Sequence, residues 1–493
     1  MTESALPMLV LALLFGGVIV TALAGARGSR AVWPLAMATV TAVAAVTWRL
    51  LATVLRDGPV THVLGGWAPP IGIVLVVDAL GAVVMAVVAG VALLVMLHAR
   101  AAVRRESAER EALFYPMLLV LLLGLSGIVL TGDLFNLYVF FEISSLAAYA
   151  LIGVGDRRAV VASFRYLILG TTGASLYLLG VGFLYFLTGT LNMADAAARI
   201  PDVVGNPALT LSFVLIVVGV ALKMAVFPMH AWLGDAYTHG STTTTAAIAP
   251  IMTKVSAYVL VRMVGSVYGI ELFRTVLPIG WVLAWLSGAG ILVGSLLALA
   301  QRDVKRMLAY SSIAQISYIG LGIGIAQPWA VIGALLHVVN HAVMKCCLFL
   351  VAGVVELETG RRDVDAWAGL GRRFPVTFAA FTVAGLAMIG IPPTGGFFSK
   401  WYLMVGGLAA HAWALTALLV ASGVLTAAYM FRVFERAWAR PAPDDLAPRS
   451  LGVLVRVPIV ALGVAVLALG LANAWIVTHV LAPALPPALR GGV

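Results

Sequence analysis

Five lysines are the residues of this 493-residue chain whose placement points most directly to chemistry. One of them, Lys305, stands where an apolar segment begins, whereas the other four lie inside long apolar segments: Lys223, Lys254, Lys345 and Lys400. All other basic residues are arginines, and most of them fall in polar interruptions. Arginine keeps its proton in proteins, whereas a lysine buried away from water can lose its proton. The segregation therefore indicates that the buried lysines gain and release protons.

A structural alternative is open for two of these lysines. Lys254 and Lys400 each lie near an expected end of an apolar segment, where a long side chain can reach the membrane surface or a helix end. The alternative fits Lys223 and Lys345 poorly, because both lie well inside their segments. A charged side chain at the centre of a membrane helix costs roughly 2.5–3.5 kcal/mol, so polar partners are expected for all four.

The candidate partner of Lys223 is Glu142, in the stretch LYVFFEISSLAAY at 137–149. It is the only carboxylate well inside the apolar segments between 115 and 266. An ion pair would hold Glu142 ionised and Lys223 protonated, and separating the two would favour release of the proton. His230 follows Lys223 by seven residues, nominally on the same helix face, with Pro228 between them. It is a secondary candidate.

A polar stripe is expected in LLHVVNHAVMKCCLF at 335–349. His337, His341 and Lys345 are four residues apart in turn and drift only about 80° around a helix. The HxxxH spacing is used by metal sites, but neither a cysteine nor a carboxylate joins it on that face. Histidines bonded to neighbouring backbone are the structural alternative, and histidines that titrate beside a lysine favour a proton relay. Neither a metal nor a disulfide is expected, since the adjacent Cys346 and Cys347 diverge on a helix.

The remaining acidic residues have weaker claims. Asp78, in VLVVDALGAVV, lies inside an apolar segment and is a secondary candidate that could transfer protons or pair with a neighbouring helix. Asp133, Asp235 and Asp303 fall at segment ends, where capping or loop contacts are expected. The chain contains no GxxxxGK[ST], no GxGxxG after a strand and no CxxC. Nucleotide, flavin and iron–sulfur cofactors are therefore not expected.

The elements that position these residues are membrane helices. The chain is 62% hydrophobic and 11% charged, with a mean hydropathy of +1.05, whereas soluble domains carry about 25% charged residues. Apolar runs of about 20 residues span a bilayer and recur throughout. We predict an all-α polytopic membrane protein, a single membrane domain over 1–493. Fourteen spans are expected at 6–24, 31–53, 71–97, 115–131, 134–153, 163–187, 208–230, 246–266, 279–300, 306–325, 328–354, 375–405, 413–433 and 454–480.

Two of these spans should be broken, and the chain should repeat. Pro228 falls in span 7 and IPPTGG at 391–396 falls in span 12. SSLAAYALIGVG at 144–155 matches SSIAQISYIGLG at 311–322, and LKMAVFP at 222–228 resembles LAMIGIP at 386–392. We predict two inverted five-helix repeats over 115–266 (spans 4–8) and 279–433 (spans 9–13). Transporters of this kind place their sites near the membrane middle, at broken helices.

The loops predict the orientation. Odd-numbered loops hold 21 basic residues and even-numbered loops hold five, so the odd loops should be cytoplasmic and both termini outside. The first span, Leu6–Ala24, lacks a preceding basic region, which favours a spanning helix over a cleaved signal. The net charge of +10 is thus a topology signal, and no nucleic-acid partner is expected.

Six motifs then resemble a known family. In order they are TGDLFNLYVFFEISSLAAY, KMAVFPMHAWL, MTKVSAYVLVR, DVKRMLAYSSIAQISYIGLG, HVVNHAVMKCCLF and GIPPTGGFFSKW. They resemble the proton-translocating antiporter-like subunits of Mrp-type cation/proton antiporters, respiratory complex I and membrane-bound hydrogenases, over about residues 70–435. GDLFNLYVFFE, GWAPPIGIVLVVD at 66–78 and TGTLNMAD at 188–195 are similar to the D-type member of the Mrp antiporters. His230 and Gly234 depart from that member, and His230 makes its loop more like the complex I and hydrogenase relatives.

The resemblance implies an order for the site residues. Glu142 and Lys223 would form the ion pair of the first half-channel, and Lys254 would be the next relay lysine. His337, His341 and Lys345 would connect the two halves, and Lys400 would end the second.

The resemblance also implies a function. The expected protein is a proton-translocating subunit of a multi-subunit antiporter that exchanges protons for a monovalent cation, Na+ or another, in the bacterial inner membrane. It would be a transporter subunit rather than an enzyme, and it would be active only with other membrane subunits. Two alternatives are a proton-pumping subunit of a complex I-like NADH-quinone oxidoreductase or membrane-bound hydrogenase, and a membrane subunit of an inorganic-carbon uptake complex.

Overall fold

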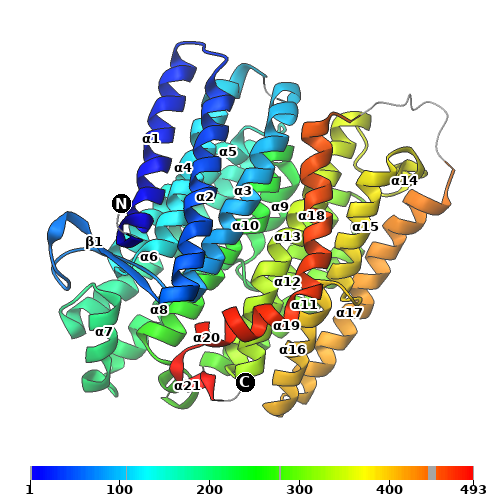
Figure 1. Ribbon diagram of the computed structural model, residues 1–493. Coiled ribbons are helices and arrows are strands. Elements are labelled where there is room, and N and C mark those ends of the chain that lie inside the picture. Colours follow the sequence, from blue (N-terminus) through cyan, green and yellow to red (C-terminus); the bar gives the residue numbers. More distant parts are fainter. Residues whose placement is uncertain (1–2, 107, 277–278, 442–450, 492–493) are drawn as a thin grey trace.

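Long helices lie side by side and make up almost the whole molecule (Figure 1). The computed structural model describes residues 3–106, 108–276, 279–441 and 451–491, so Arg449, one of the loop arginines, lies outside the described residues. The α-helices are α1 (Leu6–Ala26), α2 (Val32–Asp57), α3 (Ala79–Glu106), α4 (Glu111–Leu130), α5 (Leu134–Gly153), α6 (Ala159–Thr188), α7 (Met193–Arg199), α8 (Pro207–Met224), α9 (Ala231–His239), α10 (Thr242–Arg262), α11 (Ile279–Leu299), α12 (Val304–Ile325), α13 (Pro328–Thr359), α14 (Leu370–Arg373), α15 (Pro375–Ile389), α16 (Gly395–Ala409), α17 (Trp413–Phe434), α18 (Val453–Leu471), α19 (Asn473–Ile476), α20 (Ala482–Ala484) and α21 (Pro487–Arg490).

The helices confirm an all-α polytopic membrane protein. Within the described ranges, thirteen helices are long and apolar enough to cross a membrane, and the count is fourteen if the bent pair Asp365–Arg373 and Pro375–Ile389 is one span. The predicted span at 375–405 is in fact two helices, α15 and α16, of 15 residues each. The break expected at IPPTGG separates them, so neither alone reaches the length of a full span.

A small β-hairpin was not predicted. Strands β1 (Val60–Val63) and β2 (Val74–Val77) pair antiparallel and project from the helices near α7 (Figure 1). The predicted span at 71–97 therefore begins only at Ala79. Both strands are rich in β-branched residues, which favour paired strands. A short apolar run that continues into a helix cannot be told from that helix by hydropathy alone.

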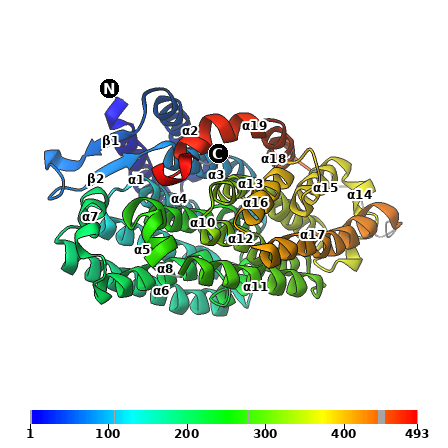
Figure 2. The ribbon, with the colours of Figure 1, turned by 90° about the horizontal axis from the view of Figure 1, so that it is seen from below.

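Three helices form the enclosed core of the molecule. In α10, α12 and α13, 94% of the most apolar window is buried inside the protein, against 33% in α1 and α2. Figure 2 shows these three helices in the middle, with α6 and α11 along one side. Lys254 lies on α10, and His337, His341 and Lys345 lie on α13. The predicted site residues of these helices are therefore held in the most enclosed part of the fold.

The two expected helix breaks are present and end in the same way. The helix α8 stops at Met224, where Ala225 adopts a left-handed conformation (φ 63°) and Val226 N donates to Ala221 O at 2.9 Å. The helix α15 stops at Ile389, where Gly390 has φ 95° and Ile391 N donates to Leu386 O at 3.1 Å. This pattern is a common helix ending. The boundaries and inversion of the two repeats stay predictions.

Close backbone contact fixes α16 against α13. A Cβ added at Gly406 would meet the backbone nitrogen of Ala330 at 2.2 Å and its Cα at 2.6 Å. No side chain can rotate away to relieve such a contact, so the two helices can approach this closely only because residue 406 is glycine. The contact holds the helix that bears Lys400 beside the helix that bears the two histidines.

We predict that Gly406→Ala destabilises the fold by about 1–3 kcal/mol, as overpacking does, because α16 must move away from α13. The measurement is the midpoint of thermal unfolding of the purified protein in detergent. Gly90→Ala is the matched control, since nothing lies within 4 Å of its added Cβ and alanine favours a helix over glycine. A midpoint for Gly406→Ala equal to that of the control would contradict the packing argument.

Candidate functional site

Lys223 lies in the last turn of α8 and is only 4% exposed. Its Nζ donates to Ser145 Oγ at 2.6 Å, and the nitrogen lies 5.9 Å from the centre of the Phe141 ring. A positive charge in the last turn of a helix is stabilised by the negative end of the helix dipole. The side chain of Trp232 also closes this end, because its indole N–H donates to Leu222 O at 3.0 Å. The broken helix thus offers a polar environment to the buried ammonium.

Glu142 lies near Lys223 but does not touch it. The carboxylate attracts the ammonium through space, yet these two described side chains form no direct ion pair, and Glu142 Oε1 is buried without a hydrogen-bond partner. On α5, Glu142 shares an outward stripe with Val139 and Leu146, which are 37% and 58% exposed. The predicted pair is therefore open in this structure, with Ser145 holding the lysine, and the role of Glu142 stays a prediction.

Lys254 is buried at 2% exposure in the middle of α10. Its Nζ donates to Ala249 O at 2.7 Å and to Thr253 Oγ1 at 3.3 Å, so the side chain turns back along its own helix. Pro250 interrupts the same stretch of α10 and has no N–H to offer Ala246 O. The thiol of Cys346, on α13, lies 3.8 Å from that oxygen and supplies a weak donor.

The stripe on α13 is fully buried. The rings of His337 and His341 stack with centroids 5.6 Å apart, and His337 Nδ1 lies 2.9 Å from Ser399 Oγ on α16. Both ring nitrogens of His341 are buried and have no hydrogen-bond partner among the described residues. Lys345 Nζ donates to Ser311 Oγ at 2.6 Å and to Leu308 O at 2.9 Å, both on α12.

Lys400 joins this stripe from α16. Its Nζ donates to Met388 O at 2.7 Å and to Ile389 O at 3.1 Å, which are the last carbonyls of α15. The ammonium also lies 4.8 Å from the centre of the Tyr318 ring, within the range of a cation–π contact. Lys400 is thus bonded to the end of the helix segment that precedes its own.

The structure brings five of the predicted residues into one cluster. The members interact electrostatically: His341 interacts with Lys254 and Lys345, and His337 interacts with Lys254 and Lys400. No ion pair formed by the described residues includes a member of this group. We call it the lysine–histidine cluster: Lys254, His337, His341, Lys345 and Lys400.

The two secondary candidates lie elsewhere. His230 lies in the turn between α8 and α9, where its ring stacks on Phe227 at 5.3 Å. Asp78 is not inside a membrane helix, because α3 begins one residue later, and it binds Arg262 through two hydrogen bonds of 2.6 and 2.8 Å. Burial favours the protonated carboxyl, but these hydrogen bonds and the charge of Arg262 hold the pKa of Asp78 below its usual value. Asp78 therefore pairs with the neighbouring helix α10, as the second of the two interpretations of this residue expected.

Sequence reasoning missed the hydroxyl groups that hold the ionisable side chains. Ser145 binds Lys223, Ser311 binds Lys345 and Ser399 meets His337. A signal was present for two of them, since both lie at the start of the matching stretches at 144–155 and 311–322. Asp133 and Asp303 do cap α5 and α12, as predicted.

This geometry defines a class of protein. Its members are polytopic helical membrane proteins with a buried axis of lysines and histidines between two helix breaks. The family described as "NADH:quinone oxidoreductase/Mrp antiporter, TM" matches residues 131–426. The chain belongs to this family.

Relatives and solved structures of several kinds are similar to the chain. The N-type subunit of the NADH-quinone oxidoreductase of Desulforudis audaxviator is 47% identical over 450 residues, which is 89% of each chain. The D-type subunit of the Na(+)/H(+) antiporter of Alkalihalophilus pseudofirmus is 34% identical over 421 residues, or 84% of each. A chain of the Mrp complex from Dietzia sp. DQ12-45-1b aligns with a TM-score of 0.89 at 26% identity, covering 100% of this chain and 99% of that one. A chain of the archaeal membrane-bound sulfane sulfur reductase aligns with a TM-score of 0.90 at 28% identity, covering 97% and 96%.

We predict that Asp78→Asn destabilises the protein by about 1–2 kcal/mol, because the Arg262 pair fastens α3 to α10 and is partly exposed. The measurement is the midpoint of thermal unfolding. Asp57→Asn, which alters an exposed pair with Arg56, is the control and should change little. A midpoint for Asp78→Asn equal to that of the control would contradict the structural role.

Proposed function

We propose that the chain is a proton-translocating subunit of a multi-subunit monovalent cation/proton antiporter, with sodium as the cation. The observation that supports this most is the lysine–histidine cluster, which contains five basic groups and no paired carboxylate among the described residues. Basic groups that act on one another electrostatically inside an apolar core cannot all be protonated together. The cluster therefore holds fewer protons than it has sites, and a proton that arrives at one end favours release at the other.

The neighbours of each group support the order of transfer that the family resemblance implies. His341 has two unpartnered ring nitrogens and lies in the fields of Lys254 and Lys345. His341 can therefore accept a proton from one of these lysines and donate a proton to the other. His337 stacks on His341 and feels Lys400, so it extends the same route toward α16.

Glu142 and Lys223 form the first half-channel in this proposal. The open pair in the structure corresponds to one state, in which Ser145 holds the lysine, and closure onto Glu142 gives the other. Glu142 lies on an outward stripe of α5, and a carboxylate on such a face calls for a polar neighbour in place of lipid. This placement supports work within an assembly of membrane subunits.

The proposed architecture completes this mechanism. Two inverted repeats, at 115–266 and 279–433, would place the breaks after α8 and α15 in corresponding positions. The basic loops predict that the face with Arg157, Arg302 and Arg362 is cytoplasmic, in a bacterial inner membrane, with both termini outside.

A redox-driven proton pump is the second candidate. It is favoured by the 47% identity to a protein named as part of an NADH-quinone oxidoreductase and by the fit to a chain of a respiratory sulfur-reductase complex. The chain itself would then be part of an enzyme complex. Co-purified iron–sulfur subunits and proton movement that needs an electron donor would favour this candidate, whereas sodium-dependent antiport without a donor favours the first.

We predict that Lys223→Ala and Lys223→Arg both abolish sodium-dependent dissipation of a pH gradient in inverted membrane vesicles, with the complex still assembled. Arginine keeps the charge but does not release its proton, so the pair of variants separates a need for titration from a need for charge. Arg30→Ala, in an exposed loop, is the control. Antiport at the wild-type rate in Lys223→Arg would exclude titration of this residue.

A further inference from the structure

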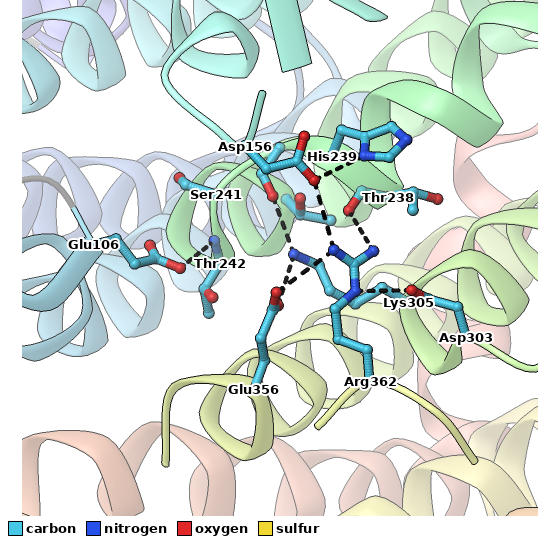
Figure 3. A network of polar contacts seen from close by, with 12 residues as sticks. Glu106, Asp156, Thr238, His239, Ser241, Thr242, Asp303, Lys305, Glu356 and Arg362 are labelled. Atoms are coloured by element: carbon cyan, nitrogen blue, oxygen red, sulfur yellow. Dashed lines mark hydrogen bonds and ion pairs between the residues drawn. The ribbon is translucent and has the colours of Figure 1, made fainter. Parts of the chain in front are cut away.

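A second polar network lies at the ends of the helices, on the face that the loop arginines mark. It joins α3, the α5–α6 loop, α9, α10, α12, α13 and the segment after α13 (Figure 3). We call it the helix-end network: Glu106, Asp156, Thr238, His239, Ser241, Thr242, Asp303, Lys305, Glu356 and Arg362. None of these residues belongs to the proposed transfer route.

Lys305 is the buried centre of this network. Although it stands at the start of α12, it is only 4% exposed. Its Nζ lies 3.1 Å from Glu356 Oε2 and donates to Gly240 O at 3.0 Å. Glu106 interacts electrostatically with Lys305 and Glu356, and its Oε1 accepts a hydrogen bond from the backbone N–H of Thr242 at 2.9 Å. Glu356 is thus the carboxylate paired with the buried ammonium, and Glu106 acts on that ammonium only through space.

The outer side of the network opens to a surface cavity of about 560 Å³ lined by Asp156, His239, Asp303 and Arg362, among others. Arg362 lies between this cavity and Glu356: its guanidinium is 2.7 Å from Asp303, 3.6 Å from Asp156 and 3.6 Å from Glu356. Burial favours the protonated form of Asp156, but its hydrogen bond with His239 and the charge of Arg362 outweigh this and lower the pKa of Asp156. The cavity side thus stays charged and hydrated at neutral pH.

The inner side of the network faces the lysine–histidine cluster. Glu356 follows Lys345 by eleven residues on α13, and Lys254 follows Thr243 by eleven residues on α10. Eleven residues make about three turns, so each pair shares a helix face and spans about 16 Å. The helices α10 and α13 pack directly, since an added Cβ at Gly353 would overlap Thr242.

Polar groups without partners lie along this contact. Thr242 and Thr243 are 1% and 0% exposed, and the hydroxyl of Thr243 has no hydrogen-bond partner in the described part of the protein. The side chain of Thr242 acts on the carboxylate of Glu106. Buried hydroxyls of this kind are usually satisfied by ordered water. Glu106 Oε2, next to Thr242, is also buried and has no hydrogen-bond partner within the described ranges. These groups form the network end of a path toward Lys254 and Lys345, which lie about 16 Å further along α10 and α13.

We propose that Glu356 and Glu106, arranged around Lys305, are the proton-uptake site of this protein on the Arg362 face, and that they load Lys345 and Lys254 through the hydroxyls of Thr242 and Thr243. The inference rests on the proposed function. A proton from the cavity binds Glu356, which weakens its pair with Lys305, and then leaves along the hydroxyl chain, so the carboxylate is restored. Arg362 is a positioning residue that holds Glu356 beside the cavity.

The neighbouring charges that bear on Glu356 come from every element packed around it: Glu106, Lys305 and Arg362, together with Asp156 behind Arg362. Glu358, two residues further along α13, instead forms its ion pair with Arg105 on α3. It offers a matched control at the same end of the same helix.

The test measures antiport in inverted vesicles that contain the whole complex, while the pH is varied separately on each side. We expect Glu356→Gln and Glu106→Gln to lower the rate at least tenfold and to remove its rise as the pH falls on the Arg362 face. The pH dependence on the opposite side should be unchanged. Glu358→Gln should behave as wild type, and Glu356→Asp, which retains a carboxylate, should restore most of the rate.

The outcomes separate the two proposals. Lys345→Ala is measured in parallel and should be inactive under the proposed function; transport by that variant would overturn the function itself. An inactive Lys345→Ala protein beside fully active glutamine variants would overturn only the uptake site. If Glu356→Gln fails to assemble, Glu106→Gln and Glu356→Asp decide: an unchanged pH profile in Glu106→Gln, or no activity in an assembled Glu356→Asp protein, would overturn the proposal.

Discussion

A buried ammonium must be surrounded by oxygen atoms, and the rest of this structure depends on how that need is met. An α-helix uses nearly all of its carbonyl oxygens internally and leaves only those of its last turn free. In this fold, helices end next to the buried lysines, so free carbonyl oxygens lie near the ammonium groups. Lys223 lies in the last turn of α8, and Lys400 binds the last carbonyls of α15. Where a helix continues, a serine or threonine hydroxyl completes the set, as Ser311 does for Lys345.

Much of this arrangement could be predicted from the sequence, because lysines, prolines and apolar runs have strong and local consequences. The enclosed position of Lys345 and the break near Pro228 follow from composition and from the missing N–H of proline. The partner of Lys223 could not be predicted in the same way. Glu142 and Ser145 are three residues apart on α5, and only the packing around that helix decides which of them reaches the lysine. A carboxylate is the obvious partner by charge, but here the hydroxyl of Ser145 is the group that reaches the ammonium.

Asp78 shows a second limit of the sequence. The run from Val74 to Val84 is apolar on both sides of the aspartate, and hydropathy places all of it in one helix. In the structure the first four residues pair with β1. Asp78 therefore lies just before the N-terminus of α3, where Arg262 donates a hydrogen bond to it. The decisive partners, β1 and Arg262, are distant in sequence. The helix-end network was missed for the same reason, since its members come from seven separate segments that only the fold brings together.

The bond from Lys400 to the end of α15 has a mechanical consequence. The carbonyls of Met388 and Ile389 form the negative end of one helix segment, and the ammonium that neutralises them is built into the next. When the charge on this nitrogen is lost, the attraction that closes the joint between α15 and α16 weakens. If Lys400 titrates as the proposed function requires, the geometry of this joint depends on a single charge. Under that proposal, a subunit packed against α16 would detect the proton through a small displacement of the helix.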